Sequence, residues 1–365
     1  MAPIKTAKDF IAAVHNRQFP ISCHFELTYQ CNMHCIHCYI VRKKTAELTT
    51  GEIVTYLKQL KNAGCLHLIF TGGEPFLRKD IFEILEHARS LDFDIRIFTN
   101  GTLIDKRAAI KIRKIVPSAV EISLYGFKNT HEKVTRMQGS FAKTINAIAK
   151  LIEMGVNVLV KTTVLQYNVH ELWKLRQFVK HTLKAQFLDS KGLYRIFPCD
   201  DASTGPLHHA LSDLQMKHYI EDGLYRHQPM RSSNKLLNID PNLPLCGAGR
   251  RVSNITPYGQ LNPCVRLRFN NGNSLKRASF IRIWCDNKLF KSLRASRMRD
   301  RKHCRGCPSL SYCSYCPSYT YFETGSFLTT SSELCRQARI QKEVYEKWSQ
   351  KHGENRTSSL SVQKI

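Results

Sequence analysis

The sequence predicts an α/β fold in which a partial (β/α)6 barrel is followed by a small cysteine-rich domain. Two observations lead to this prediction. Strand-like apolar runs alternate with helix-like stretches over residues 21–200, and cysteines accumulate in the C-terminal third. Alternating strands and helices are typical of a parallel sheet covered by helices. Because the runs number about six rather than eight, we expect an open or partial barrel.

The expected strands are short runs rich in β-branched and aromatic residues. Between them, apolar residues at helical spacing follow Thr50 and Ser140, which are candidate N-caps. Gly64 and Gly155 are candidate helix stops. The strand-like runs cover residues 21–29, 66–72, 94–101, 119–126, 157–164 and, more weakly, 185–197.

The length of 365 residues leaves room for about two domains. Few strong signals lie between residue 201 and residue 240, so we expect this stretch to bridge the two. The expected segments are an N-terminal extension (1–20), the barrel (21–200), the bridging segment (201–240), the cysteine-rich domain (241–345) and a polar tail (346–365).

The composition indicates a cytoplasmic protein without membrane association. No apolar run approaches the ~18 residues of a membrane helix, and the N-terminus lacks the apolar stretch of a signal peptide. Disulfides are rare in the reducing cytosol. The fourteen cysteines therefore indicate metal binding or catalysis.

Three of these cysteines, Cys31, Cys35 and Cys38, have the spacing C-x3-C-x2-C directly after the first expected strand. That position is the C-terminal edge of the sheet, where barrel active sites lie. Thiolates suit zinc, copper(I) or iron–sulfur clusters. Three ligands leave one metal position open for a small molecule. The alternative is a zinc site completed by His34 or His37.

The second expected strand ends in Thr71-Gly72-Gly73-Glu74-Pro75. Adjacent glycines let a ligand approach the backbone closely, and a carboxylate beside them suits a cationic group. By itself such a stretch would be an ordinary strand-end turn. After the three-cysteine motif, at the same edge of the barrel, a ligand site becomes the better interpretation.

Together, CNMHCIHCY and GGEP resemble the motifs of the radical S-adenosylmethionine (SAM) superfamily, over residues 21 to about 200. The resemblance implies that Cys31, Cys35 and Cys38 hold a 4Fe–4S cluster. The methionyl amino and carboxylate groups of SAM would chelate its fourth iron, so that the cosubstrate completes the site.

Further SAM contacts follow from the same resemblance. Glu74 would contact the methionyl amino group, and Gly72 and Gly73 would supply backbone contacts. Tyr39 would lie near the adenine. Ser123 would approach the ribose, although Tyr125-Gly126 replaces the Asp-Gly of many relatives. Two further cations, Arg136 and Lys161, are candidate partners for the SAM carboxylate, beside the simpler interpretation as charges at the barrel mouth.

The C-terminal cysteines resemble those of the SPASM domain that follows the barrel in many radical SAM enzymes. The resemblance implies two auxiliary 4Fe–4S clusters, hence three clusters in all. The nearer would be held by Cys246, Cys264 and Cys316, and the farther by Cys304, Cys307, Cys313 and Cys335. The spacing from Cys313 to Cys316 is one residue shorter than usual in the family. The fourth position of the nearer cluster is open to Cys199, to substrate or to no ligand, and zinc remains the alternative for this half.

Net charge is the remaining clue to the substrate. The chain carries +26, and residues 276–305 hold eleven Lys or Arg against Asp286 and Asp300. Such a field attracts polyanions, either nucleic acid or an acidic peptide, unless it is a solvated basic face. No nucleic-acid-binding motif accompanies it, so a nucleic-acid partner is not favoured. The stretch EISLYGFKNTHEKVTRMQGSF is similar to enzymes that mature ribosomally made peptides (RiPPs), which favours an acidic peptide.

The activity implied is reductive cleavage of SAM to a 5′-deoxyadenosyl radical, which abstracts hydrogen from a peptide and leads to a crosslink or an oxidation. An electron donor such as flavodoxin or ferredoxin is implied as well. Because only about twenty residues precede the first strand, a separate peptide-recognition protein is a further expected partner. The alternatives are maturation of a sulfatase-like protein, action on a tetrapyrrole or quinone cofactor precursor, RNA modification, and a non-catalytic zinc-binding protein.

Overall fold

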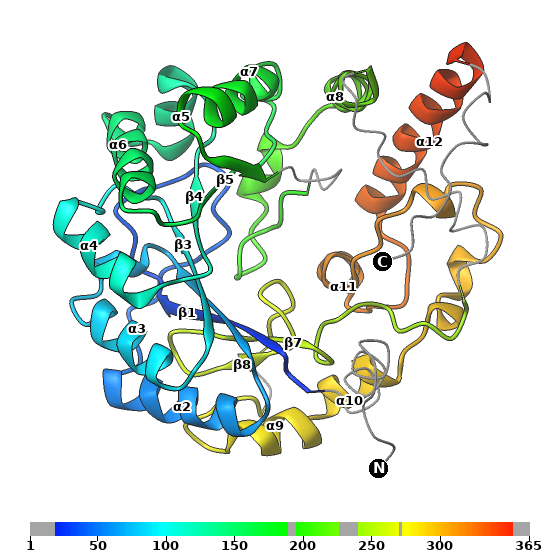
Figure 1. The fold of residues 1–365 in the computed structure, drawn as a ribbon. Coiled ribbons are helices and arrows are strands. Elements are labelled where there is room, and N and C mark those ends of the chain that lie inside the picture. Colours follow the sequence, from blue (N-terminus) through cyan, green and yellow to red (C-terminus); the bar gives the residue numbers. More distant parts are fainter. Residues whose placement is uncertain (1–18, 189–194, 226–239, 270–271, 353–365) are drawn as a thin grey trace, which may run out of the picture.

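A computed structural model describes residues 19–188, 195–225, 240–269 and 272–352. Within these ranges one eight-stranded sheet has the order β6-β5-β4-β3-β2-β1-β7-β8 (Figure 1). All its neighbours are parallel except β7 and β8. The strands are β1 (Ser22–Thr28), β2 (His67–Gly72), β3 (Asp94–Thr99), β4 (Ala119–Ser123), β5 (Val158–Lys161), β6 (Gln186–Leu188), β7 (Val252–Ile255) and β8 (Leu261–Asn262).

The first six strands confirm the predicted partial barrel, each shorter than the apolar run that predicted it. Residues 189–194 of the sixth run lie outside the described residues. Helices follow the strands and cover the outer face of the sheet (Figure 1). They are α2 (Thr50–Asn62), α3 (Ile81–Ser90), α4 (Lys106–Ile115), α5 (Lys128–Thr135), α6 (Ser140–Glu153) and α7 (Leu172–Gln177), with a π-helical turn η2 (Phe178–Thr182) after α7.

The starts of α2 and α6 differ by one residue from the predicted N-caps. Thr49, not Thr50, caps α2: its side chain accepts from the Glu52 N–H, and the Glu52 carboxylate accepts from the Thr49 N–H at 2.8 Å. This capping box satisfies two donors at once. Ser140 begins α6 instead of capping it. The predicted stops agree with the structure, because Gly64 and Gly155 take left-handed φ values of 87° and 71° just beyond α2 and α6.

The pleat of β1 separates core from cavity. Cys23, Phe25 and Leu27 are fully buried against α2 and α3, and the intervening residues point to the other face. Alternation of this kind is the two-residue period of a strand. The inward positions of the barrel strands are therefore the ones available to build a site.

The C-terminal part continues the barrel sheet. Strand β7 pairs in parallel with β1, with Ser22 opposite Val252 and Phe25 opposite Ile255. Phe280 and Trp284 join the core formed with α2 and α3. The cysteine-rich part thus shares both a sheet and a core with the barrel. Its helices are α9 (Phe280–Asp286), α10 (Lys288–Ala295), α11 (Pro317–Thr324) and α12 (Ser332–His352), and its short 3-10 turns are η5 (Met298–Asp300), η6 (Lys302–Cys304) and η7 (Leu310–Tyr312).

Two segments outside the predicted domains contain helices. The predicted bridging segment contains η3 (Gly205–His209) and a regular helix, α8 (Asp213–Tyr225). This helix packs on α12, with Lys217 and Glu343 2.8 Å apart. Helix α12 runs on to His352, so residues 346–352 of the predicted polar tail are helical. No helix in the described ranges is long and apolar enough to span a membrane.

Candidate active site

The three-cysteine loop, residues 31–38, leaves the end of β1 and lies against the end of α5. The N–H groups of His34 and Ile36 donate to the carbonyls of Thr135 (3.2 Å) and Val134 (3.0 Å). The Arg42 guanidinium donates at 2.8 Å to the carbonyls of Cys31 and of Met33. Side chain and backbone together therefore fix the loop at the C-terminal edge of the sheet.

The three thiols of this loop suit a metal cluster. Burial raises the pKa of each, and the Cys38 and Cys31 side chains raise the pKa of Cys35 further. Thiols placed together with raised pKa values become thiolates when a cation compensates them. No three His, Cys, Asp or Glu side chains of the described chain surround a position for a single metal ion. In a four-iron cluster each iron takes its own thiolate, so three cysteines can hold three of the four irons.

The loop forms one wall of a cavity of about 530 Å³. Around this cavity the structure brings together most of the residues predicted for SAM and its cluster: Cys31, Cys35, Cys38, Tyr39, Gly72, Gly73 and Ser123. Other wall residues, among them Phe98, Thr99, Asn100, Phe197 and Arg266, were not singled out from the sequence.

The two glycines have a structural reason in addition to the predicted one. A Cβ on Gly72 would come within 2.2 Å of the Thr28 carbonyl oxygen, and one on Gly73 within 2.2 Å of the Gln30 carbonyl oxygen. Gly72 also has a φ of 133°, which side-chain-bearing residues rarely adopt. The glycines therefore let the end of β2 pass directly under the start of the three-cysteine loop.

The Glu74 carboxylate is surrounded by hydrogen-bond donors of the protein. Its side chain is fully buried and is not part of the cavity wall. The carboxylate accepts hydrogen bonds from the Asn100 N–H (2.7 Å), the Thr99 hydroxyl (2.8 Å) and the Phe76 N–H (3.1 Å). Burial raises its pKa to about 7. Glu74 thus positions Thr99 and Asn100, which line the cavity, and its contact with SAM stays a prediction.

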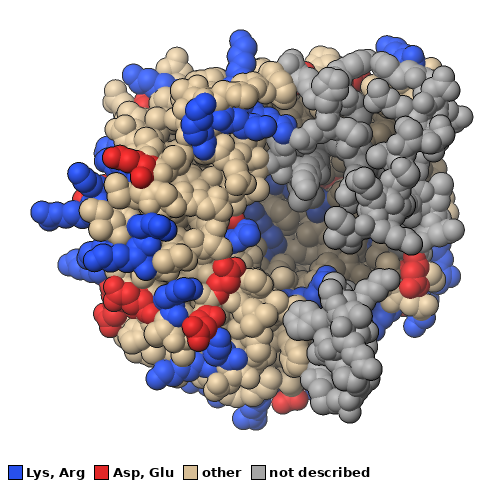
Figure 2. All heavy atoms as spheres, in the orientation of Figure 1, with Lys and Arg blue, Asp and Glu red and all other residues tan. Residues whose placement is uncertain are grey.

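The cavity wall is basic. Its described residues include five Lys or Arg and no Asp or Glu: Arg42, Arg136, Lys161, Arg195 and Arg266. In the view of Figure 2, which has the orientation of Figure 1, a recess with Lys and Arg at its wall lies in the middle of the molecule. The buried acids nearby already have partners, since Glu26 and Asp200 pair with Arg268 at 2.7 and 3.0 Å. A ligand that fills this cavity therefore meets an excess of positive charge.

A second cavity, of about 230 Å³, contains the four cysteines predicted for the farther auxiliary cluster. Cys304, Cys307, Cys313 and Cys335 all line it. Arg301 donates to the Cys304 sulfur at 3.0 Å. Four thiols around one enclosed space are the donor set that a 4Fe–4S cluster takes.

The three cysteines predicted for the nearer auxiliary cluster also lie close together. The pKa of Cys246 is raised to about 11, chiefly by burial and also by the neighbouring Cys264 and Cys316 side chains. Backbone N–H groups point at two of these sulfurs, from Ala248 to Cys246 (3.4 Å) and from Leu267 to Cys264 (3.3 Å). Donors of this kind tune iron–sulfur clusters.

Cys199 is one of the three options for the fourth position of the nearer cluster. Its Sγ contacts the Cys38 carbonyl oxygen at 3.6 Å, so it lies beside the three-cysteine loop. All three options stay open.

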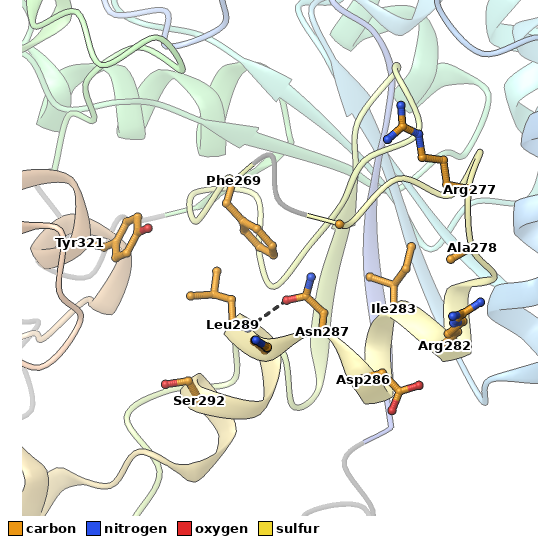
Figure 3. A pocket seen from close by; sticks show the side chains of 12 residues that line it. Phe269, Arg277, Ala278, Arg282, Ile283, Asp286, Asn287, Leu289, Ser292 and Tyr321 are labelled. Atoms are coloured by element: carbon orange, nitrogen blue, oxygen red, sulfur yellow. Dashed lines mark hydrogen bonds between the residues drawn. The ribbon is translucent and has the colours of Figure 1, made fainter.

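Outside the cavity, a groove of about 740 Å³ runs between α9, α10 and α11. Figure 3 shows Phe269, Ile283 and Leu289 along it and Tyr321 of α11 on the opposite side. Its charged residues are three cations and one acid: Arg277, Arg282, Lys288 and Asp286. The groove thus combines an apolar floor with a basic rim.

Barrel, cysteine loop and glycine turn together define a class of protein: an α/β partial-barrel enzyme built to hold metal clusters on thiolates. Residues 25–179 match the model of the radical SAM superfamily, and residues 246–308 match that of SPASM, an iron–sulfur cluster-binding domain. The chain belongs to the radical SAM superfamily and carries a SPASM domain, so its cofactors are SAM and iron–sulfur clusters.

Similar proteins include the mycofactocin maturase MftC of Mycobacterium ulcerans, 27% identical over 293 residues (77% of this chain and 78% of MftC). The AdoMet-dependent heme synthase of Methanosarcina barkeri is 27% identical over 330 residues (83% of this chain and 93% of the synthase). The crystal structure of Streptococcus suis SuiB bound to the precursor peptide SuiA has a TM-score of 0.65 at 17% identity (90% of this chain and 79% of SuiB).

Proposed function

We propose that this enzyme modifies an acidic, ribosomally made peptide by forming a crosslink or an oxidation within it. One observation carries the proposal: the 530 Å³ cavity is lined jointly by the three-cysteine loop of the barrel and by residues 265–266, which directly follow the auxiliary-site Cys264. Substrate in this cavity would lie between the two kinds of cluster site. Similarity to a maturase, and to a fold found with a precursor peptide, supports the same conclusion.

Different residues would bind the clusters, bind SAM and exclude water. Cys31, Cys35 and Cys38 would hold the SAM-binding 4Fe–4S cluster, and the two C-terminal groups of cysteines would hold two more. When bound, SAM and its cluster would supply 5′-deoxyadenosyl radical chemistry at an unactivated carbon of the substrate, and clusters held by the C-terminal cysteines would provide a place for the electron released. Tyr39, Ser123 and the Gly72–Gly73 backbone would bind and orient SAM. The buried walls would exclude water, which limits side reactions.

The proposal includes partners and a compartment. An electron donor such as flavodoxin or ferredoxin would deliver the electron that starts turnover. A separate peptide-recognition protein would present the substrate. We place the reaction in the cytoplasm, because cluster ligation needs reduced thiols and that compartment keeps them reduced.

The test is incubation of anaerobically reconstituted enzyme with SAM, a reductant and the peptides encoded beside its gene. A mass loss of two hydrogens in one peptide is the expected result for a crosslink. No mass change in any peptide, despite steady formation of 5′-deoxyadenosine, would refute the proposal.

A tetrapyrrole substrate is the second candidate. Two observations favour it: the likeness to a heme synthase over 83% of this chain, and a cavity wall with five cations, which suits a ligand bearing several carboxylates. Incubation with carboxylated porphyrins in the same assay distinguishes the two functions. A porphyrin product without a peptide product would replace the peptide proposal.

A further inference from the structure

The five cations of the cavity wall differ in the partners that they already contact within the protein. Arg42 donates to two loop carbonyls. Lys161 pairs with Glu121 at 3.4 Å, and Arg195 lies close to the sulfurs of Cys316 and Cys313, two predicted cluster ligands. Arg136 and Arg266 remain, and neither forms an ion pair with a carboxylate of the described chain. Two guanidinium groups thus face the cavity with their charge available.

Arg266 is held in a fixed orientation. Its guanidinium carbon lies 4.1 Å from the ring centroid of Tyr39 and 4.3 Å from that of Phe197. Asp200, the acid whose field reaches it, is engaged by Arg268 at 3.0 Å. Aromatic rings that stack on a guanidinium stabilise its charge through cation–π attraction and fix the orientation of its plane. The N–H donors at its edge then form a preorganised fork, the geometry that binds a carboxylate with two parallel hydrogen bonds.

The two free cations come from different parts of the chain. Arg136 directly follows Val134 and Thr135, whose carbonyls bind the three-cysteine loop, so it belongs to the SAM side of the cavity. Arg266 lies two residues after Cys264, so it belongs to the auxiliary-site side. SAM brings one carboxylate, which one of these two cations suffices to neutralise.

We propose that Arg266 binds a carboxylate of the peptide substrate and so anchors the peptide between the two cysteine sites. The inference rests on the proposed peptide function and names a chemical feature of the substrate. The carboxylate is either the side chain of an Asp or Glu or the C-terminal carboxylate of the peptide. In both cases the substrate carboxylate would form the ion pair that Arg266 lacks within the described chain.

The experiment uses the reconstituted holoenzyme with SAM, immobilised and exposed to a pool of short N-acetylated synthetic peptides. The pool contains matched pairs in which Asp and Glu are replaced by Asn and Gln, each with a free or an amidated C-terminus. Bound peptides are quantified by mass spectrometry for the wild type, Arg266→Gln, Arg266→Lys and the control Arg89→Gln, an exposed arginine on α3.

Wild type should retain carboxylate peptides over their carboxamide partners by roughly 10- to 100-fold, the contribution of hydrogen bonds to a charged group. Arg266→Gln should abolish this preference while its iron content and SAM affinity stay unchanged. Arg266→Lys should keep part of it, and Arg89→Gln all of it. Preference for Asp and Glu, or for the free C-terminus, identifies which carboxylate is bound.

Three results would overturn the inference: no carboxylate preference in the wild type, an unchanged preference in Arg266→Gln, or loss of SAM binding in that variant. The last would assign Arg266 to SAM. These results are separable from failure of the proposed function, which is read from the mass change of candidate substrates. A carboxylate preference that depends on Arg266, without modification of any peptide, would refute the function and leave the binding site standing.

Discussion

The Glu74 carboxylate accepts a 2.7 Å hydrogen bond from the backbone N–H of Asn100, and this contact ties the turn after β2 to the end of β3. The same carboxylate accepts from the Thr99 hydroxyl at 2.8 Å. Thr99 and Asn100 line the cavity while Glu74 does not. The acid of the Gly-Gly-Glu motif therefore acts on the cavity through its neighbours.

Glu74→Ala should lower the free energy of unfolding by about 3 kcal/mol, because buried donors lose their acceptor at a cost of ~1–3 kcal/mol each. SAM binding should weaken with it, since the residues that line the cavity lose their support. Urea unfolding and equilibrium dialysis with SAM measure the two effects. Glu83→Ala, on the exposed side of α3, is the matched control. A variant of normal stability that has lost SAM binding would instead indicate the direct contact expected from the sequence.

Stability should also depend on pH through Glu74. Burial raises its pKa to about 7, against an ordinary value of 4.5. Between these values the folded protein keeps a proton that the unfolded chain has released. The stability contribution is therefore present below about pH 4.5 and is lost as pH rises towards 7. The wild type should lose roughly 1 kcal/mol per pH unit relative to Glu74→Gln, which cannot ionise. If the free energy of unfolding changes equally with pH in the two proteins between about pH 5 and pH 7, this assignment is wrong.

The sequence sufficed for the barrel because its signals are local. Each of the six strands lies within a run that the sequence marks as strand-like, and each predicted stop is a glycine with a left-handed φ. Strand β7 is different. It has four residues, Val252–Ile255, and it forms by pairing with β1, which lies far away in the chain. No local pattern reports such a partner.

The site residues likewise fall into those that a local motif predicts and those whose role depends on the fold. Cys31 and Gly72 belong to motifs, so spacing alone placed them together. Arg266 is a single cation in the stretch CVRLRF. Its role depends on Tyr39 and Phe197, which only the fold brings to it. Likewise, the basic run 276–305 does not reveal that Arg294 is used inside the protein, where it donates to the Gly249 carbonyl.

Replacing Cys31, Cys35 and Cys38 together by alanine should leave roughly eight of twelve irons and abolish SAM cleavage. The loop is the candidate SAM site, whereas the seven cysteines predicted for the auxiliary clusters form two separate groups. Iron assay and chromatography of 5′-deoxyadenosine measure both outcomes. Cys285→Ala, an exposed cysteine outside all three groups, should match the wild type. Stoichiometric zinc with little iron in the wild type would contradict the cluster assignment.

Substrate binding should weaken steeply with salt, because eight of the eleven cations in residues 276–305 are exposed. Exposed charges are screened within about 10 Å at 0.1 M salt. Arg282→Glu combined with Lys288→Glu, two cations that line the groove, should reduce the affinity for an acidic peptide several-fold and flatten its salt dependence. Fluorescence anisotropy with a labelled acidic peptide measures both. Tight binding of generic RNA without binding of acidic peptides would point to a nucleic-acid substrate instead.

Cys335 separates SAM cleavage from product formation. It lines the 230 Å³ cavity with Cys304, Cys307 and Cys313, remote in sequence from the three-cysteine loop. Cys335→Ala should therefore lose roughly four irons and still form 5′-deoxyadenosine, yet yield little modified peptide. Measuring nucleoside and peptide product in parallel tests this expectation.

Two other outcomes would each assign Cys335 a different role. Normal peptide turnover in Cys335→Ala would show that the farther site does not accept the electron. Loss of SAM cleavage would mean either that electrons enter through this site or that the fold has collapsed, since β7 and the barrel share one sheet. Iron content decides between these two. A variant that keeps roughly eight irons has an intact fold and a broken electron route, whereas one that loses nearly all its iron has collapsed.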